Sequence, residues 1–293
     1  MADYVISCCS TSDLNLEHYV KRNIKVAYFH YEIDGKPYLD DGEYPIAEFY
    51  KAMAAGAMTK TSQINVDEYI AHFEQYLKAG NDIIHLTLSS GISGTINSAN
   101  VAANELREKY PDRKLYIIDS LAASSGYGLL MDKIADLRDE GRSIEEVKSW
   151  VIENRLYLNH WFFTTDLTYF VRGGRITKAA GWVGGALKIC PLLDVDKEGK
   201  LVPRTKHRGK ENVIHAAAQK MLKNANGGAE YADKCYISQS ACMDDAEKLI
   251  REIEALVPAM KGKIEIYDIG TTIGSHTGPG TVALFFWGKK RED

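Results

Sequence analysis

Short apolar segments alternate with helical patterns along most of this 293-residue chain, and that alternation restricts its fold more than any other feature. Asp82–Leu88 and Lys114–Ile118 are apolar runs with the length typical of buried parallel strands. Helical patterns occupy Val66–Lys78, Thr95–Tyr110 and Gly128–Glu140. Strands that alternate with helices in this way predict a parallel sheet with helices on its faces.

The pattern changes after about residue 155. A strand, Trp161–Thr165, precedes two glycine-rich helical pieces around Phe170 and Val183. Leu192–Asp196 and Lys200–Arg204 then flank a short loop that suits a hairpin. Two helix–strand pairs and a last apolar strand follow. A hairpin combined with helix–strand units indicates a mixed or antiparallel sheet.

The sequence therefore predicts an α/β protein of two domains. Residues 1–155 are expected to form a three-layer α/β/α domain with a mainly parallel sheet. Residues 156–293 are expected to form a two-layer α/β domain with a mixed or antiparallel sheet. A chain of this length is long enough for two domains of ordinary size.

Composition excludes several classes of protein. A formal net charge of −4 argues against a general nucleic-acid surface, which is normally basic. The longest apolar run, Val282–Trp287, is far too short to cross a bilayer, and the N-terminus shows no signal-peptide pattern. The five cysteines include no C-x-x-C spacing, which favours reduced thiols. We therefore expect a cytoplasmic protein without integral membrane association.

The common catalytic and cofactor motifs are absent. There is no P-loop, and the segment around Ser93, Gly91–Thr95, does not match G-x-S-x-G. Gly278–Ala283 matches a dinucleotide-binding fingerprint in letters only, because a strand-like segment and the chain end follow it. The eight histidines show no metal-ligand spacing. The sequence predicts neither a metal nor a cofactor.

Small hydroxyl-rich turns lie next to the predicted strands and helices. Thr61–Gln63 precedes one helix, Ser89–Thr95 joins a strand to its helix, and Asp119-Ser120 follows the next strand. Ligands bind at the carboxyl ends of strands in open parallel sheets, and such turns offer hydroxyls and free backbone N–H groups. They predict an anion site, for a carboxylate or a phosphate. The alternative, that these segments are only helix caps and tight turns, stays open.

His276 is the best imidazole candidate in the chain. It stands among glycines and a proline, at Gly270–Gly280, where the backbone is expected to form special turns and to approach a ligand closely. A lone histidine is more often an ordinary core or surface residue, so the context carries this prediction.

Taken together, the segments resemble the DegV family of bacterial fatty-acid-binding proteins. The matching motifs occur in family order over nearly the whole chain: T-S-Q at Thr61–Gln63, S-S-G-I-S-G-T-x-x-S-A at Ser89–Ala99, Asp119-Ser120 with the later Gly126-x-Gly128, L-T-Y-F-x-R-G-G-R-I at Leu167–Ile176, P-L-L-x-x-x-x-E-G-K-L-x-P-R at Pro191–Arg204, and I-G-S-H-T-G-P-G at Ile273–Gly280. One departure is Cys9, which replaces an aspartate of the family's opening T-D-S-T-A-D-L.

The resemblance implies a long-chain fatty acid, such as palmitate, stearate or oleate, in a tunnel between the two domains. It implies that Thr61, Ser93 and His276 hold the carboxylate through uncharged donors, with Ser62, Gly94 and Thr95 close by. It also implies a non-catalytic carrier that presents the carboxylate to a fatty-acid kinase. In that case Arg172, Arg175 and Arg204 are expected on the surface that meets the kinase; ordinary solvated charges or domain-interface pairs are the alternative.

Two other functions remain open from the sequence. The first is a hydrolase or phosphotransferase that uses Ser93 or His276, although no triad spacing and no nucleotide site support it. The second is a regulatory α/β module that binds a small anionic metabolite without a tail. A monomer is the default expectation.

Overall fold

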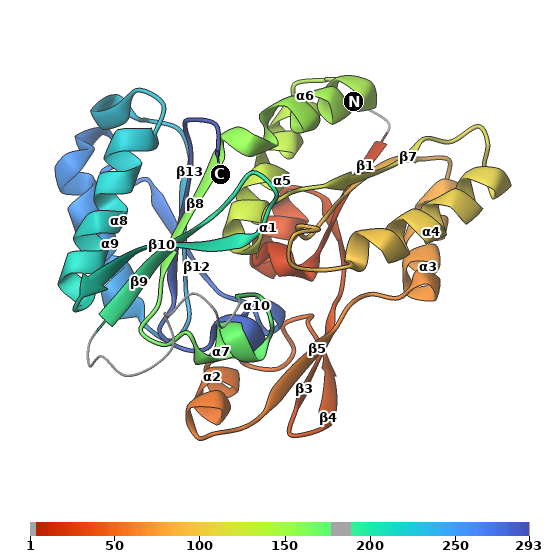
Figure 1. The fold of residues 1–293 in the computed structure, drawn as a ribbon. Coiled ribbons are helices and arrows are strands. Elements are labelled where there is room, and N and C mark those ends of the chain that lie inside the picture. Colours follow the sequence, from red (N-terminus) through yellow and green to blue (C-terminus); the bar gives the residue numbers. More distant parts are fainter. Residues whose placement is uncertain (1–3, 177–188, 293) are drawn as a thin grey trace.

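The computed structural model describes residues 4–176 and 189–292, which form three sheets and their covering helices (Figure 1). The helical piece predicted around Val183 lies outside these residues. Among the described helices, none combines the length and the apolar character needed to span a bilayer.

The first sheet is parallel throughout, as predicted. Its strand order is β2-β1-β6-β7, with β1 at Tyr4–Cys9, β2 at Ile24–Ala27, β6 at Asp82–Thr87 and β7 at Leu115–Asp119. Most of β1 and β6 is buried, which is why these strands are apolar rather than alternating.

Helices α1, α3, α4, α5 and α6 surround this sheet; they span Leu16–Lys21, Val66–Lys78, Thr95–Lys109, Ser124–Asp139 and Ile144–Asn154. Reciprocal side-chain caps mark the first residues of two of these helices, α3 and α6. The Asn65 side chain accepts from the Glu68 backbone N–H at 2.9 Å, and the Glu68 carboxylate accepts from the Asn65 N–H at 2.8 Å. Ser143 and Glu146 form the same reciprocal cap on α6.

Helix α5 forms the layer between the first sheet and the second. It contacts β1 on one side and β8, β11 and β13 on the other. Two glycines permit this close approach. A Cβ atom on Gly126 would lie 2.3 Å from the Phe285 ring, and one on Gly128 would lie 2.6 Å from both the Leu14 side chain and the Ser12 carbonyl oxygen. The two sheets therefore share a single apolar core.

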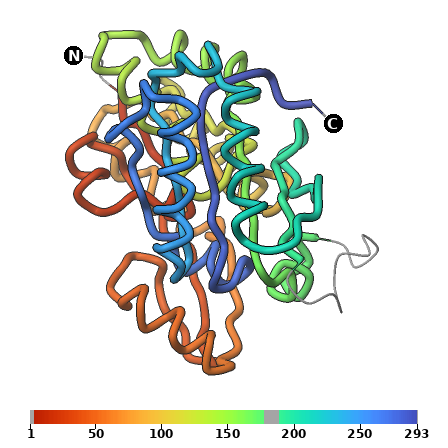
Figure 2. Tube along the Cα trace, turned by 90° about the vertical axis from the view of Figure 1, so that its left-hand side faces the viewer, coloured from red at the N-terminus to blue at the C-terminus, as the bar shows by residue number. Residues whose placement is uncertain are grey.

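The second sheet is mixed, as predicted, with strand order β10-β9-β8-β13-β11-β12. All its pairs are antiparallel except β11 with β12. Its strands are β8 (Leu158–Phe163), β9 (Ile189–Val195), β10 (Leu201–Arg208), β11 (Cys235–Gln239), β12 (Ile264–Asp268) and β13 (Val282–Trp287). Helices α8 (Lys210–Asn224) and α9 (Met243–Leu256) lie side by side over one face (Figure 2).

A third, small antiparallel sheet was not predicted. It has the order β4-β3-β5, with β3 at His30–Ile33, β4 at Lys36–Leu39 and β5 at Thr59–Ser62, and it packs with α2, Ile46–Ala54. The sequence predicts one strand over Lys25–Tyr31. The part up to Ala27 is confirmed as β2, but the strand does not continue, because the chain leaves the first sheet after Ala27 and enters β3 at His30. Two short helices from the C-terminal half, α7 (Thr168–Arg172) and α10 (Thr271–Thr277), lie beside each other, and α10 also contacts β3 and β5 (Figure 1).

All strands of the first sheet precede residue 120 and all strands of the second follow residue 157. The domain boundary near residue 155 stays a prediction. Loops from the two parts are in contact. The Ser89 hydroxyl donates to the Gly199 carbonyl at 2.8 Å, and a Cβ atom on Gly91 would lie 2.5 Å from the same carbonyl group.

Candidate functional site

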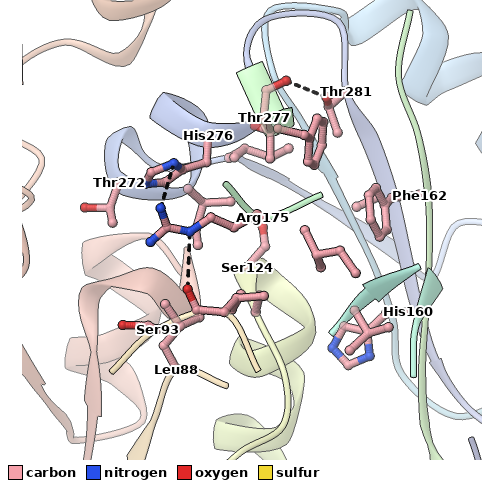
Figure 3. Close-up of a pocket in the computed structure, with 18 of the residues that line it drawn as sticks. Leu88, Ser93, Ser124, His160, Phe162, Arg175, Thr272, His276, Thr277 and Thr281 are labelled. Atoms are coloured by element: carbon pink, nitrogen blue, oxygen red, sulfur yellow. Dashed lines mark hydrogen bonds between the residues drawn. The ribbon is translucent and has the colours of Figure 1, made fainter. Parts of the chain in front are cut away.

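A narrow cavity lies between the first and second sheets, next to α7 and α10 (Figure 3). Its volume is about 80 Å³, or about 750 Å³ if the space out to the solvent at its mouth is included. Both halves of the chain supply its wall, and so does the small sheet. Apolar side chains dominate that wall, including Leu88, Phe162, Phe170, Val195, Leu201 and Phe285.

Polar side chains gather at the end of the cavity beneath α10. Thr61 comes from β5, His276 from α10, Arg175 from the segment after α7, and Ser93 from the turn after β6. Thr61 Oγ1 and His276 Nε2 are 2.7 Å apart, and Arg175 Nη1 lies 3.4 Å from His276 Nδ1. Arg175 Nε also donates to the Ile92 carbonyl at 3.2 Å, which ties it to the Ser93 turn (Figure 3).

These contacts determine which nitrogen of His276 carries the proton. A guanidinium group can only donate, so Nδ1 accepts from Arg175 and the proton of the neutral ring is on Nε2. Nε2–H then donates to Thr61 Oγ1, which leaves the Thr61 hydroxyl proton free to point elsewhere. Burial first, and the nearby charge of Arg175 second, lower the pKa of His276 from 6.5 to about 4, so the ring is neutral at pH 7.

The sequence predicts His276 in a glycine-rich turn, whereas it lies in the last turn of α10. The turn begins two residues later, at Gly278, where φ is +70°. Only glycine fits at position 173, because a Cβ atom there would lie 2.3 Å from His276 Nδ1. The glycine lets α7 approach the imidazole closely enough for Arg175 to reach it.

The other predicted ligand residues are placed differently. Ser93 lines the cavity and its Oγ accepts from the Thr95 N–H at 3.2 Å. Thr95 itself is fully buried, and its hydroxyl pairs with the Tyr69 hydroxyl at 2.8 Å, outside the cavity wall. Ser62 and Gly94 are exposed and do not line the cavity.

The three predicted surface arginines also differ from one another. Arg172 is stacked over the Tyr169 ring at 5.4 Å, and Arg204 forms an ion pair with Asp194 at 2.8 Å. Arg175 is instead part of the cavity wall. The polar end therefore carries a positive charge, in contrast to the expected set of uncharged donors. The signal that could have placed Arg175 is the Gly173-Gly174 pair that precedes it, which indicates close approach of the backbone to a neighbour.

The geometry gives little support to hydrolysis. Within the described part of the chain, neither Ser93 nor any carboxylate is hydrogen-bonded to His276, so no triad exists there. The same residues contain no group of three His, Cys, Asp or Glu side chains that could hold a metal ion. A group bound here would meet hydroxyls, a neutral imidazole and a guanidinium, which is a set suited to an anion.

The fold and this site define an α/β protein whose sheets enclose an amphiphilic cavity, apolar along its walls and cationic at one end. A family profile described as "Uncharacterised protein, DegV family" matches residues 6–289, and the chain belongs to the DegV family. The DegV domain-containing protein CPE0026 of Clostridium perfringens is 37% identical over 294 residues, which cover all of both chains.

Two solved structures share the fold. Protein TM841 of Thermotoga maritima, whose structure is described as revealing a fatty-acid-binding function, is 27% identical, with a TM-score of 0.83 over 99% of this chain and all of that one. The Fatty Acid Kinase (Fak) B3 protein of Streptococcus pneumoniae, solved loaded with linoleic acid, is 24% identical. Its TM-score is 0.82, over 99% of this chain and all of that one.

Proposed function

We propose that this protein binds a long-chain fatty acid in the cavity between its sheets, with the carboxylate at Thr61, Ser93, His276 and Arg175. One observation carries the proposal. Within residues 4–176 and 189–292 no carboxylate pairs with Arg175, although burial lowers the pKa of its guanidinium. An anionic head group would supply the missing charge, and the apolar wall would cover its tail.

The tail is the main source of affinity in such a site, because each buried methylene contributes about 0.8 kcal/mol. Roughly 14 methylenes would give on the order of 11 kcal/mol before the cost of ordering the chain. The head group then determines orientation. The free Thr61 hydroxyl proton and the Arg175 guanidinium are its donors, and a carboxylate removed from water needs such partners to avoid a loss of several kcal/mol.

The cavity is narrow, so binding of a long acyl chain should involve movement of the side chains that line it. Phe162 and Phe170 stack at 5.9 Å between ring centroids, and Phe285 lies against His160 at 5.1 Å. These rings are the parts of the wall that would rearrange around different tails.

The direct test is mass spectrometry of lipid extracted from the purified protein, followed by binding of a fluorescent fatty acid to the delipidated chain. We expect one C14–C18 acid per chain. Arg175→Met and Thr61→Val should each weaken binding of the acid by about tenfold or more, whereas the corresponding fatty alcohol should bind both variants and the parent alike. Thr95→Val, outside the cavity, is the matched control for Thr61→Val. Equal affinity of parent and variants for the acid would refute the head-group assignment.

We further propose that the protein is a non-catalytic carrier for a fatty-acid kinase and works in the cytoplasm. Five free thiols, four of them buried, agree with a reducing compartment. A kinase assay with ATP and the loaded carrier would measure acyl phosphate. Arg172→Ala should lower its formation without changing lipid affinity; unaltered turnover would remove Arg172 from the contact surface.

A further inference from the structure

A second cavity lies next to the fatty-acid site, between the turn after β1, the small sheet, and the start of α10. We call it the acidic pocket, after its four carboxylates, Asp13, Asp40, Asp41 and Asp268. Its volume is about 430 Å³, compared with about 80 Å³ for the fatty-acid cavity. None of the described residues that line it is a lysine, arginine or histidine.

Asp13 is the least accessible of these carboxylates. It is 7% exposed, and its Oδ2 accepts from the Ser124 hydroxyl at 2.6 Å. Its Oδ1 is buried without a hydrogen-bond partner among the described residues; the Gly270 backbone N–H favours the charged carboxylate but does not form a regular hydrogen bond with Oδ1. A buried carboxylate oxygen without a donor is costly, so it points to a missing donor.

Asp40 faces the same space. Its two oxygens accept from the Ser10 hydroxyl at 2.8 Å and the Thr271 hydroxyl at 2.5 Å, both of which are uncharged donors. A Cβ atom on Gly270 would lie 2.6 Å from Asp13 Oδ1 and 3.8 Å from Asp40 Oδ1. Both oxygens therefore lie next to the Gly270 backbone, where a side chain would clash with Asp13 Oδ1.

Among the described residues, no cation pairs with either carboxyl group. Burial raises the pKa of Asp13 and of Asp40 above the ordinary aspartate value, and the hydroxyl contacts only partly offset it. A cation between them would favour both charged forms. Aromatic side chains complete the surroundings, since Tyr19, Tyr28, Tyr31, Tyr44 and Tyr267 line the same pocket.

We propose that the acidic pocket binds a primary alkylammonium group, with the nitrogen between Asp13 and Asp40 and the alkyl stem against the tyrosine rings. An ammonium fits better than a guanidinium, which prefers two free oxygens of one carboxylate, because Asp13 offers only Oδ1. It fits better than a metal ion, since the described residues hold no three-ligand cluster. Tyrosine rings also attract organic cations.

The source of the ammonium is either a free amine or the lysine side chain of another protein. Isothermal titration calorimetry of the full chain distinguishes these two sources. The titrants are 1,4-diaminobutane, Nα-acetyl-lysine amide and, as a third, magnesium chloride. We expect at least one amine to bind. Binding of the diamine alone indicates a free amine, and binding of the blocked lysine alone or more tightly indicates a protein side chain. Binding of magnesium alone, or of nothing, overturns the proposal.

The variants locate the site. Asp13→Asn and Asp40→Asn keep side-chain shape, and each should weaken amine binding by about tenfold or more, while Asp112→Asn, an exposed aspartate outside the pocket, should change nothing. Circular dichroism checks the fold, and Asp40→Asn carries the test if buried Asp13 does not tolerate replacement. Unchanged affinity in a folded Asp40→Asn chain would overturn the assignment. No lipid enters the titration, so its outcome is independent of the fatty-acid proposal.

Discussion

Replacement of Gly173 by alanine tests the geometry of the head-group site most directly. The added Cβ atom would lie 2.3 Å from His276 Nδ1, whereas ordinary contacts are at about 3.5 Å, so the ring or α7 has to move by roughly 1 Å. Movement of the ring breaks its 2.7 Å hydrogen bond to Thr61, and movement of α7 breaks the contact between Arg175 and His276. Overpacking costs about 1–3 kcal/mol and the lost hydrogen bond about 1 kcal/mol more.

The expected result is a loss of about 2–4 kcal/mol in the free energy of unfolding, which corresponds to a fall of roughly 4–8 °C in Tm. Fatty-acid affinity should fall by about tenfold or more, because Thr61 and Arg175 lose their common partner. Gly174→Ala is the matched control: its φ is +72° with nothing within 4 Å, so it adds backbone strain of about 1–2 kcal/mol without contact. If Gly173→Ala binds the acid as tightly as Gly174→Ala does, the close approach of α7 has no role in the site.

Two further predictions concern titration and ion pairing. The pKa of His276 is about 4 in the folded chain and near 6.5 unfolded, so the unfolded state binds more protons between these values. Stability should therefore fall as pH drops through that window, by up to about 3 kcal/mol from this residue, and His276→Gln should flatten the dependence of the urea midpoint on pH; an equally steep curve would contradict this. Lys234 pairs with Asp132, whose side chain is 4% exposed, and thereby joins α5 to the second sheet. Lys234→Met should cost about 1–3 kcal/mol in chemical unfolding, against less than about 1 kcal/mol for Lys248→Met, because the partner of Lys248, Glu211, is 75% exposed; equal effects would mean that burial of Asp132 is unimportant.

The elements that the sequence predicts well are those with local signals. Helix α3 has the predicted bounds, Val66–Lys78, because apolar spacing, the Asn65 cap and the following Gly80 all lie within one segment. The small sheet escaped prediction for the opposite reason. Strand β5 reads Thr-Lys-Thr-Ser and has only four residues, so its strand character depends on pairing with β3, nearly 30 residues earlier. Pairing at that distance leaves no local pattern.

The site residues fall into the same two groups, those indicated by local motifs and those placed by contacts between distant segments. The motifs indicated Thr61, Ser93 and His276, and all three line the cavity. Thr95 belongs to the same motif as Ser93, yet its hydroxyl is taken by Tyr69, which lies on another helix. Arg175 was expected on the surface because a motif does not show the direction of a side chain. Its direction is set by α7 against α10, a contact between segments 100 residues apart in sequence.

The polar end of the cavity depends on three short elements that would be weak alone. Strand β5 has four residues, α7 five and α10 seven, and helices this short gain little stability from their own hydrogen bonds. Thr61, Arg175 and His276 connect them through side chains, and the guanidinium among these lacks a carboxylate in the described residues. An anion at this point would contact all three elements at once. A ligand stabilises the state that binds it. A fatty acid should therefore raise the stability of these three elements more than that of the parallel sheet, because its head group would contact all of them.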